Sequence, residues 1–339
     1  MLKAVFTEPY EIVIEEAPIP GPAPGEALVK VAACGICGTD LKINEGHYLG
    51  RLPVTPGHEF TGVVEALGEG VTGVAPGDRV AIDPNLPCRR CVFCRRGAVH
   101  LCLDSQAVGV TRPGGFAEYC AAPAELLVPV PEALPLNLAA MMEPVSCCLH
   151  GMDLAGVRPG DEVILLGGGS IGLILLQLAR AAGATYTAVS EPRAEKRELA
   201  RSLGADAAVS PQEIVDLAAS LPGGGGQVVI ECVGVAAVAE QAVHLVRPGG
   251  TVLLFGVSPP GAQIPIEPYV IFHKEITIRG CYTNPFTDTR SLALLGSRRV
   301  VVEPLISHTY PIDQVAEGLQ AVRRGETVKA QVVPGGMSP

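Results

Sequence analysis

The sequence predicts an α/β protein of two domains, one rich in β-strands and one built on a doubly wound parallel sheet. The chain has 339 residues, which is more than a single hydrophobic core usually organises. Up to about residue 130, short apolar runs are separated by turns rich in Gly and Pro, which is typical of a β-rich domain. From about residue 159, strand and helix patterns alternate, which favours a parallel sheet with crossover helices.

The expected elements follow this division of the chain. The β-rich part contains expected strands at residues 27–31, 60–67 and 78–83. The parallel-sheet part contains six, at residues 162–166, 187–189, 207–209, 228–231, 251–255 and 276–279. Helices are expected up to residue 182, from 193 to 203, and ending near 246. The pattern is mixed again after Gly280, so we assign residues 1–147 and 287–339 to the first domain and 148–286 to the second.

Composition excludes several classes of function. The formal net charge of -10 argues against a nucleic-acid partner, which needs a basic face. The N-terminal stretch is acidic where a secretory signal would be apolar, so we expect a cytoplasmic protein. The most apolar run, residues 163–179, contains several glycines and is shorter than the ~20 residues of a membrane span. No membrane partner is therefore expected.

Cysteine usage points to metal binding. Eleven cysteines, an odd number without secretory context, favour reduced thiols over a disulfide framework. The absence of Trp and the 30 prolines fit either a heat-adapted protein or a biased genome, and both explanations stay open.

Four of these cysteines form a compact metal motif, with the spacing Cys88-x2-Cys91-x2-Cys94-x7-Cys102. Four thiolates can hold one zinc ion tetrahedrally, which leaves no position for water or substrate. We therefore expect this zinc to be structural. An iron–sulfur cluster is the alternative, and metal analysis would distinguish the two.

Ligands for an open, catalytic zinc are expected in three separate motifs, each of which has an alternative role. Cys37 lies in CGICGTD, where the two cysteines could be a redox pair. His58 lies in PGHEF and could be an ordinary structural histidine. Glu143 lies in MMEPVSCC and could be a helix-capping charge. Three protein ligands and one open position are what a catalytic zinc needs.

A dinucleotide site is predicted at the start of the parallel sheet. Gly167, Gly169 and Gly172 follow an expected strand and open a helix, with Ser170 and Ile171 at its first turn. The glycines allow a tight turn, approach of the backbone to a pyrophosphate, and close packing of helix on strand. A tight turn without a ligand is the alternative.

The end of the second strand indicates which dinucleotide binds. Glu191 lies nineteen residues after Gly172, where a carboxylate accepts hydrogen bonds from ribose hydroxyls and repels a 2′-phosphate. NAD is therefore favoured over NADP. Arg193, Lys196 and Arg197 oppose this preference, because basic side chains there can hold the phosphate; they could also form a solvated helix face.

In their order along the chain, these five motifs resemble the zinc-containing medium-chain alcohol dehydrogenases, above all the polyol (sorbitol-type) and threonine dehydrogenase branch. The resemblance covers essentially the whole chain. It implies a GroES-like catalytic domain, a Rossmann domain that binds NAD, and an active site in the cleft between them. It also implies a homo-oligomer, either a dimer or a tetramer.

The resemblance assigns roles residue by residue. Cys37 and His58 correspond to ligands of the catalytic zinc, and Glu143 to a third ligand, bound directly or through water. Glu59 corresponds to a glutamate near the metal that can enter its coordination sphere. Asp40 would orient the ring of His58.

Further roles concern the proton and the cofactor. Thr39 corresponds to a hydroxyl that relays the substrate proton. Backbone around the nicotinamide, and a basic residue of the adenosine pocket, are implied at Phe255, Gly256, Val257, Gly280, Cys281 and Lys196. Lys42 stands where many relatives have histidine, so the proton would leave through ribose and water or through His47, or Lys42 would meet a phosphorylated substrate.

The leading prediction is an NAD- and zinc-dependent dehydrogenase that oxidises a secondary alcohol of a polyol or sugar alcohol, with one catalytic and one structural zinc per subunit. L-Threonine 3-dehydrogenase is an alternative, favoured by the stretch VGVTRPGGFAEYC at residues 108–120 and opposed by Lys42. A non-catalytic NAD-binding or quinone-reductase-like relative is another, opposed by the presence of both sets of zinc ligands.

Overall fold

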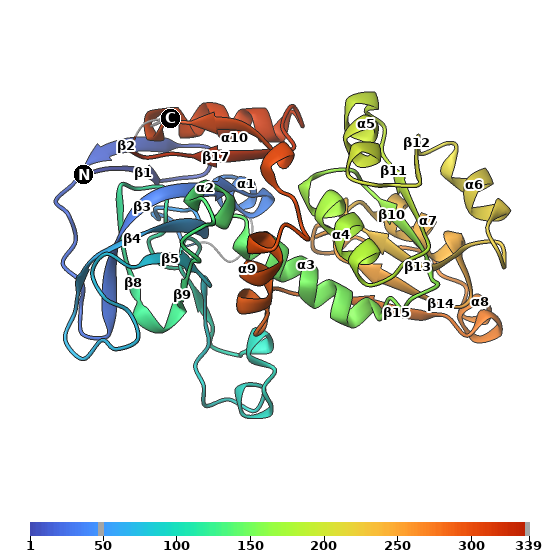
Figure 1. Cartoon of the computed structure of the whole chain (residues 1–339), viewed down its shortest axis with the longest axis horizontal. Helices are drawn as coiled ribbons and strands as arrows, with labels where there is room; N and C mark the ends of the chain where they lie inside the picture. Colours follow the sequence, from blue (N-terminus) through green and yellow to red (C-terminus); the bar gives the residue numbers. More distant parts are fainter. Residues whose placement is uncertain (47–50, 336–339) are drawn as a thin grey trace. The chain divides into compact units, whose positions relative to one another are not determined.

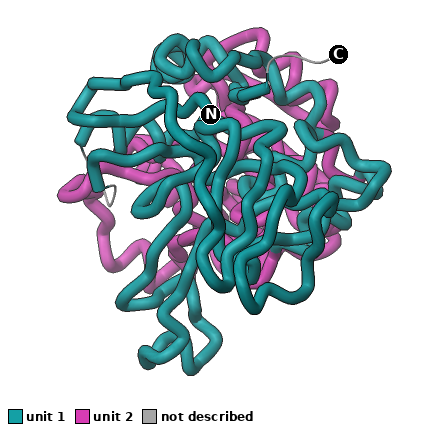
Figure 2. Tube along the Cα trace, turned by 90° about the vertical axis from the view of Figure 1, so that its left-hand side faces the viewer, with its two compact units in different colours: residues 1–144, 288–298, 302–339 teal, residues 145–287, 299–301 magenta. Residues whose placement is uncertain are grey.

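The computed structural model describes residues 1–46 and 51–335 and divides the chain into two compact units (Figure 2). Unit 1 consists of Met1–Pro144, Asp288–Arg298 and Val302–Pro339, and unit 2 of Val145–Thr287 and Arg299–Val301. The expected domains differ from these units by residues 145–147 and 287, and by the short segment 299–301, which is part of unit 2. Gln177 accounts for that segment, because its side-chain oxygen accepts the N–H of Val301 (2.7 Å) and its amide donates back to the Val301 carbonyl (3.0 Å).

Unit 1 is built around a seven-stranded sheet, in which six strands have the order β16-β17-β3-β4-β5-β9 and the seventh, β8, pairs with β3. Most neighbours are antiparallel, and only β16 and β17 run parallel. The strands are β3 Glu26–Ile36, β4 Glu59–Leu67, β5 Arg79–Ile82, β8 Tyr119–Pro123, β9 Leu127–Pro129, β16 Ile306–Tyr310 and β17 Lys329–Val332. The last two strands come from the C-terminal part of the chain, which returns to unit 1 as expected from its mixed pattern.

Smaller elements complete unit 1 (Figure 1). They are the hairpin β1 Leu2–Phe6 and β2 Ile12–Glu16, the pair β6 Asn85–Leu86 and β7 Gln106–Ala107, and the helices α1 Gly38–Asn44, α2 Leu136–Ala139, α9 Asp288–Gly296 and α10 Val315–Arg323. The short helices η1 Cys94–Arg96, η2 Val99–Leu101, η3 Ala124–Leu126, η4 Glu303–Leu305 and η5 Ile312–Gln314 lie between them. Fully buried aromatic side chains, among them Phe6, Phe60 and Phe116, fill the core against aliphatic residues of the sheet.

Unit 2 contains a six-stranded parallel sheet with the order β12-β11-β10-β13-β14-β15 (Figure 1). Its strands are β10 Glu162–Leu166, β11 Tyr186–Ser190, β12 Ala207–Val209, β13 Gly226–Glu231, β14 Val246–Leu254 and β15 Thr277–Gly280. The helices are α4 Ser170–Ala181, α5 Ala194–Ser202, α6 Ile214–Ser220, α7 Ala236–Leu245 and α8 Pro268–Lys274. The helix α3 Met142–Ala155 contains the boundary between the units.

The strand order of unit 2 fixes where a ligand can bind. The chain moves outward in one direction from β10 to β12 and in the opposite direction from β13 to β15. Right-handed crossovers therefore place α4 and α5 on one face of the sheet and α7 on the other. Between β10 and β13, where the direction reverses, the loops diverge and leave room at the carboxyl ends of the strands.

The predicted fold class is confirmed by the β-rich unit, the parallel sheet, and the relatives described below. The observed strands β10 and β12 coincide with the expected 162–166 and 207–209. Residues 246–250 were not expected to be strand, but β14 begins at Val246, next to the end of α7. Among the residues described, no helix combines the length and the apolar character needed to cross a bilayer.

Candidate functional site

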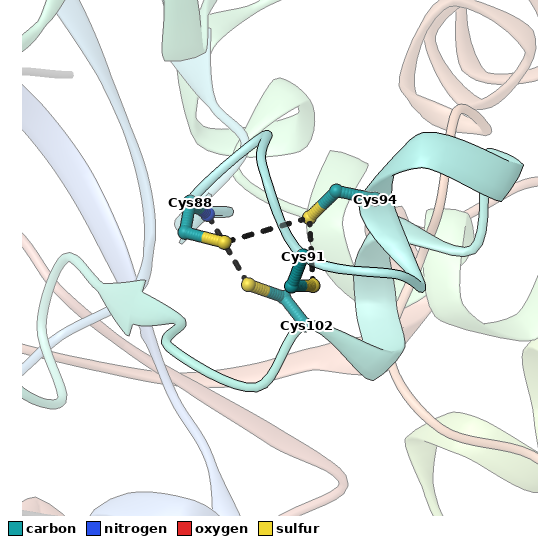
Figure 3. A group of neighbouring side chains, drawn as sticks. All are labelled: Cys88, Cys91, Cys94 and Cys102. Carbon is teal, nitrogen blue, oxygen red and sulfur yellow. Dashed lines mark hydrogen bonds between the residues drawn. The ribbon is translucent and has the colours of Figure 1, made fainter.

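The four-cysteine loop brings its sulfur atoms together. Figure 3 shows the side chains of Cys88, Cys91, Cys94 and Cys102 turned toward a common point. Their Sγ atoms all lie within 4.8 Å of one another. The Sγ of Cys94 is 3.5 Å from that of Cys91 and 4.0 Å from that of Cys88. Sulfur atoms bound tetrahedrally at about 2.3 Å from zinc would be ~3.8 Å apart, so the spacing fits this ion.

The electrostatics of the loop also favour a cation. Backbone N–H groups of Cys94 and Leu103 lower the pKa of Cys91 to about 6, which stabilises its thiolate. Burial and the neighbouring thiols instead raise the pKa of Cys94 to about 12. Backbone N–H groups of Cys88 and Asp104 point at the Sγ of Cys102 at 3.2 and 3.4 Å. Four thiolates can be charged together only if a cation balances them, and zinc supplies that balance.

A second donor set lies in unit 1, where β3 and β4 pair. The antiparallel register sets Gly35 opposite Glu59. Cys37, which follows β3, is thereby brought beside His58 and Glu59 at the start of β4. Ligand atoms of Cys37, His58 and Glu59 all lie within 4.8 Å of one another. His58 is 6% and Glu59 2% exposed, whereas Cys37 is partly accessible. One thiolate, one imidazole and one carboxylate suit a zinc site that keeps an open position.

Asp40 joins two of these residues. It is fully buried in α1, and its Oδ2 accepts the N–H of Cys37 at 2.8 Å. Its Oδ1 lies 3.6 Å from the Nδ1 of His58, which is longer than a hydrogen bond but close enough for a strong charge interaction. Burial alone would lower the pKa of His58, but Asp40 and, to a smaller extent, Cys37 together outweigh it and raise that pKa well above its ordinary value. The hydroxyl of Thr39 lies at the edge of the donor set, 3.7 Å from the Sγ of Cys37.

Glu143, expected to bind the zinc directly or through water, is not among the residues that the structure brings together here. Its side chain is buried at the start of α3, but the carboxylate does not belong to the group formed by Cys37, His58 and Glu59. Glu59, expected near the metal and able to enter its coordination sphere, is the carboxylate that lies with Cys37 and His58. The reason is local: Glu59 follows His58 directly and is fixed by the β3–β4 register, whereas Glu143 comes from a helix elsewhere in the chain.

Lys329 is a site residue that sequence reasoning missed. It opens β17, is 5% exposed, and forms a buried ion pair with Glu59. Burial would lower the pKa of Lys329, but the nearby charges of Glu59, Cys37 and Glu143 raise it, so the side chain stays charged. The pair fits tightly, because a Cβ on Gly35 would be 1.9 Å from Oε2 of Glu59. The only sequence signal for this residue is a lysine at the start of a short apolar strand. Such lysines are also common on exposed edge strands, so the signal does not indicate a buried site.

The glycine-rich turn has the geometry expected for a phosphate site. Gly167 has φ +115°, a conformation that favours glycine, and a Cβ on Gly172 would be 1.9 Å from the carbonyl oxygen of Gly167. The third glycine therefore allows helix and strand to pack. A Cβ on Gly169 would meet no atom within 4 Å, so open space faces the N-terminus of α4. Helix N-termini bind anions through free N–H groups and the helix dipole.

Glu191 lies beside this turn. Its Oε2 accepts the N–H of Gly168 at 2.8 Å and its Oε1 accepts the N–H of Arg193 at 3.0 Å. Each carboxylate oxygen keeps capacity for a further hydrogen bond. The guanidinium of Arg197 donates to the main-chain carbonyls of Glu191 (2.9 Å) and Pro192 (2.7 Å). Burial lowers the pKa of Lys196, and the nearby carboxylate of Glu191 offsets part of that lowering.

The remaining expected cofactor residues share one edge of the sheet. Phe255, Gly256 and Val257 directly follow β14, and Gly280 and Cys281 lie at the end of β15. The glycine turn follows β10 and Glu191 follows β11, so all of them lie at carboxyl ends of parallel strands. This is the edge at which open α/β sheets bind ligands. Val257 is 62% exposed, in keeping with a surface that a ligand could cover.

Comparisons with known proteins give a consistent result. The model of the alcohol dehydrogenase GroES-like domain matches residues 23–132, and that of the zinc-binding dehydrogenase domain matches residues 170–295. D-Arabinitol dehydrogenase 1 of Uromyces fabae is 33% identical, over 98% of this chain and 97% of its own. L-Threonine 3-dehydrogenase of Pyrococcus horikoshii is 35% identical, over 97% of both chains. A crystal structure from Sinorhizobium meliloti 1021, described as a zinc-binding dehydrogenase bound to NADP, has a TM-score of 0.94, 40% identity, and coverage of 98% and 99%.

Proposed function

Because the chain belongs to the zinc-containing medium-chain alcohol dehydrogenase family, we propose that it oxidises a secondary alcohol of a polyol or sugar alcohol and transfers the hydride to NAD. The observation that carries this proposal is the gathering of Cys37, His58 and Glu59 into one partly accessible donor set. A closed thiolate site cannot bind substrate, whereas three ligands leave a position for an alcohol oxygen. In this proposal unit 1 is the catalytic domain and unit 2 binds the dinucleotide.

Cys37, His58 and Glu59 would hold the catalytic zinc, and Cys88, Cys91, Cys94 and Cys102 the structural one. When bound, the catalytic zinc would polarise the alcohol hydroxyl and the nicotinamide would accept the hydride. Asp40 faces the Nδ1 of His58 and so directs Nε2 toward the metal. Glu143 would bind the catalytic zinc directly or through a water molecule.

The reaction yields a ketone, reduced cofactor and one proton, and the proton needs a path. The hydroxyl of Thr39 can both accept and donate a hydrogen bond, and it lies beside Cys37. We propose it as the first relay group. His47, considered above as a later stage, lies outside the described residues.

NAD is the proposed cofactor. Gly167, Gly169, Ser170, Ile171 and Gly172 would surround the pyrophosphate. Glu191 would accept bonds from the ribose hydroxyls, because its two oxygens are already fixed by backbone N–H groups and face the turn. Arg193 and Lys196 would line the adenosine pocket. The Sinorhizobium protein holds NADP, so the preference is to be measured by titrating both oxidised cofactors.

Threonine is the second candidate substrate. The Pyrococcus relative named L-threonine 3-dehydrogenase covers the chain as fully as the arabinitol enzyme does. Lys42 opposes this candidate, since threonine enzymes of the resembling branch usually carry histidine there. Lys42 also leaves a phosphorylated polyol open as a substrate.

A substrate panel tests the proposed function. Polyols, their phosphates, threonine and simple alcohols are supplied with NAD, and absorbance of the reduced cofactor is followed. We expect turnover with a polyol, and loss of both turnover and catalytic zinc in Cys37→Ala. Cys34→Ala is a matched control, because Cys34 is a buried thiol nearby that is not in the donor set. Full zinc content and full turnover in Cys37→Ala would refute the assignment.

Two broader points belong to the same proposal. All eleven cysteines are free in the structure, which supports a reducing, cytoplasmic setting. A dimer or tetramer is proposed on the resemblance alone, and light scattering would measure it.

A further inference from the structure

Glu231 is a buried carboxylate that none of the roles above uses. It is the last residue of β13 and is 1% exposed. Its side-chain Oε1 accepts the N–H of Val233 at 2.6 Å and that of Gly234 at 2.7 Å. Its main-chain carbonyl accepts the N–H groups of Phe255 and Gly256, both at 2.9 Å. One residue therefore holds the loops that follow two neighbouring strands.

The two loops meet backbone to backbone around this carboxylate. A Cβ on Gly256 would be 2.1 Å from the nitrogen of Gly234 and 2.6 Å from Oε2 of Glu231. Gly234 has φ +78°, and a Cβ there would be 2.6 Å from the carbonyl oxygen of Val257. Neither loop has room to shift unless the other moves. Burial raises the pKa of Glu231 above its ordinary value, and the N–H groups of Gly234, Val233 and Gly256 offset only part of that rise.

We propose that Glu231 is a positioning residue that fixes the loops 232–235 and 255–257 in one arrangement at the nicotinamide end of the cofactor site. The inference rests on the proposed function, because Phe255, Gly256 and Val257 are the residues proposed to flank the nicotinamide. Glu231 itself touches neither cofactor nor substrate in this role. It lowers the cost of binding by ordering the loops in advance.

A carboxylate suits this position better than an amide. Its Oε1 accepts the two N–H groups of the loop 232–235, and its Oε2 lies beside Gly256 of the other loop as a second acceptor. A glutamine side chain keeps one acceptor oxygen, but its other end is an NH2 group. This donor would face backbone N–H groups, which are also donors, so no hydrogen bond can form there. The Glu231→Gln variant therefore keeps the size of the side chain and the main-chain hydrogen bonds to Phe255 and Gly256, and weakens only the contacts of the carboxylate with the loops.

Two ligands separate this role from general stability. NADH contains the nicotinamide, whereas ADP-ribose lacks it and would be held by the glycine turn, Glu191 and the adenosine pocket. Calorimetric titration of Glu231→Gln is expected to raise the Kd for NADH about tenfold and to leave the Kd for ADP-ribose unchanged. Glu231→Asp, which keeps the charge with a shorter reach, should give an intermediate Kd, and it decides the question if the glutamine variant does not fold.

Asp206→Asn is the matched control. The Oδ2 of Asp206 likewise accepts a backbone N–H, that of Thr187 at 2.8 Å, but at the amino ends of the strands. Both Kd values should stay at the wild-type level in this variant. Equal weakening of NADH and ADP-ribose in the Glu231 variants, or no weakening of either, overturns the inference. A wild-type protein that binds neither ligand instead refutes the proposed function.

Discussion

Lys329 and Glu59 form a buried ion pair at the second donor set, between the first residues of β17 and β4. Both side chains are at most 5% exposed. Each charge depends on the other, because an isolated charge in such a place would be strongly unfavourable. The pair fixes the carboxylate that would bind zinc next to Cys37 and His58.

Replacing Lys329 with Met should leave Glu59 as an uncompensated buried carboxylate. We expect a loss of about 3–5 kcal/mol in the free energy of unfolding, measured by denaturant titration of protein from which the catalytic zinc has been removed, so that the ion does not balance Glu59. Zinc retention against a chelator should also change, because the charge beside Glu59 is gone. Lys3→Met is the control: its ion pair with Glu15 is at the surface (3.3 Å), and its loss should cost less than about 1 kcal/mol. Equal effects of the two substitutions would contradict the role given to Lys329.

Replacing Cys94 with Ser should remove the structural zinc and spare the catalytic one. The bound zinc should fall by one ion per chain, as measured by mass spectrometry of the metal, and the loop at residues 88–102 should become sensitive to proteases. Thiol ligands must be deprotonated, so mild acid should release this zinc from the wild type as well. Cys120→Ser, at a buried cysteine outside both donor sets, should retain both ions. An unchanged metal content in Cys94→Ser would rule out the closed site.

Alanine substitutions at two glycines of the cofactor turn should affect different properties, stability in one case and affinity for NAD in the other. Gly172→Ala forces a Cβ against the carbonyl of Gly167, so we expect a destabilisation of about 1–3 kcal/mol in thermal or denaturant unfolding. Gly169→Ala meets no protein atom, so stability should stay constant while the affinity for NAD falls. If Gly169→Ala bound NAD as tightly as the wild type, the pyrophosphate would not lie against this turn.

Replacing Glu191 with Gln should weaken the preference for NAD. The substitution removes the negative charge that would repel a 2′-phosphate, so the ratio of kcat/KM for NAD to that for NADP should fall about tenfold. Glu195→Gln is the control, because Glu195 is an exposed charge on α5 close by. A wild type that already prefers NADP would overturn the interpretation of Glu191.

Much of the architecture could be predicted because it depends on local patterns. Alternating strands and helices gave the parallel sheet, and β10 and β12 were located to the residue. The strand before Gly167 and the helix after it identify the dinucleotide turn, since both neighbours are adjacent in sequence. The element boundaries that were missed, such as the start of β14 at Val246, lie where tertiary pairing overrides local preference.

The sequence by itself determined the four-cysteine loop and the glycine turn, because their members are neighbours along the chain and short-range geometry suffices to bring them together. Only the tertiary structure decided that the ligand atoms of Cys37, His58 and Glu59 lie together, since the register of β3 on β4 sets which side chains meet. It alone also supplied Lys329 and the two loops held by Glu231. Contacts between residues far apart in sequence follow from how strands pair and pack, and one amino-acid sequence does not state that pairing directly.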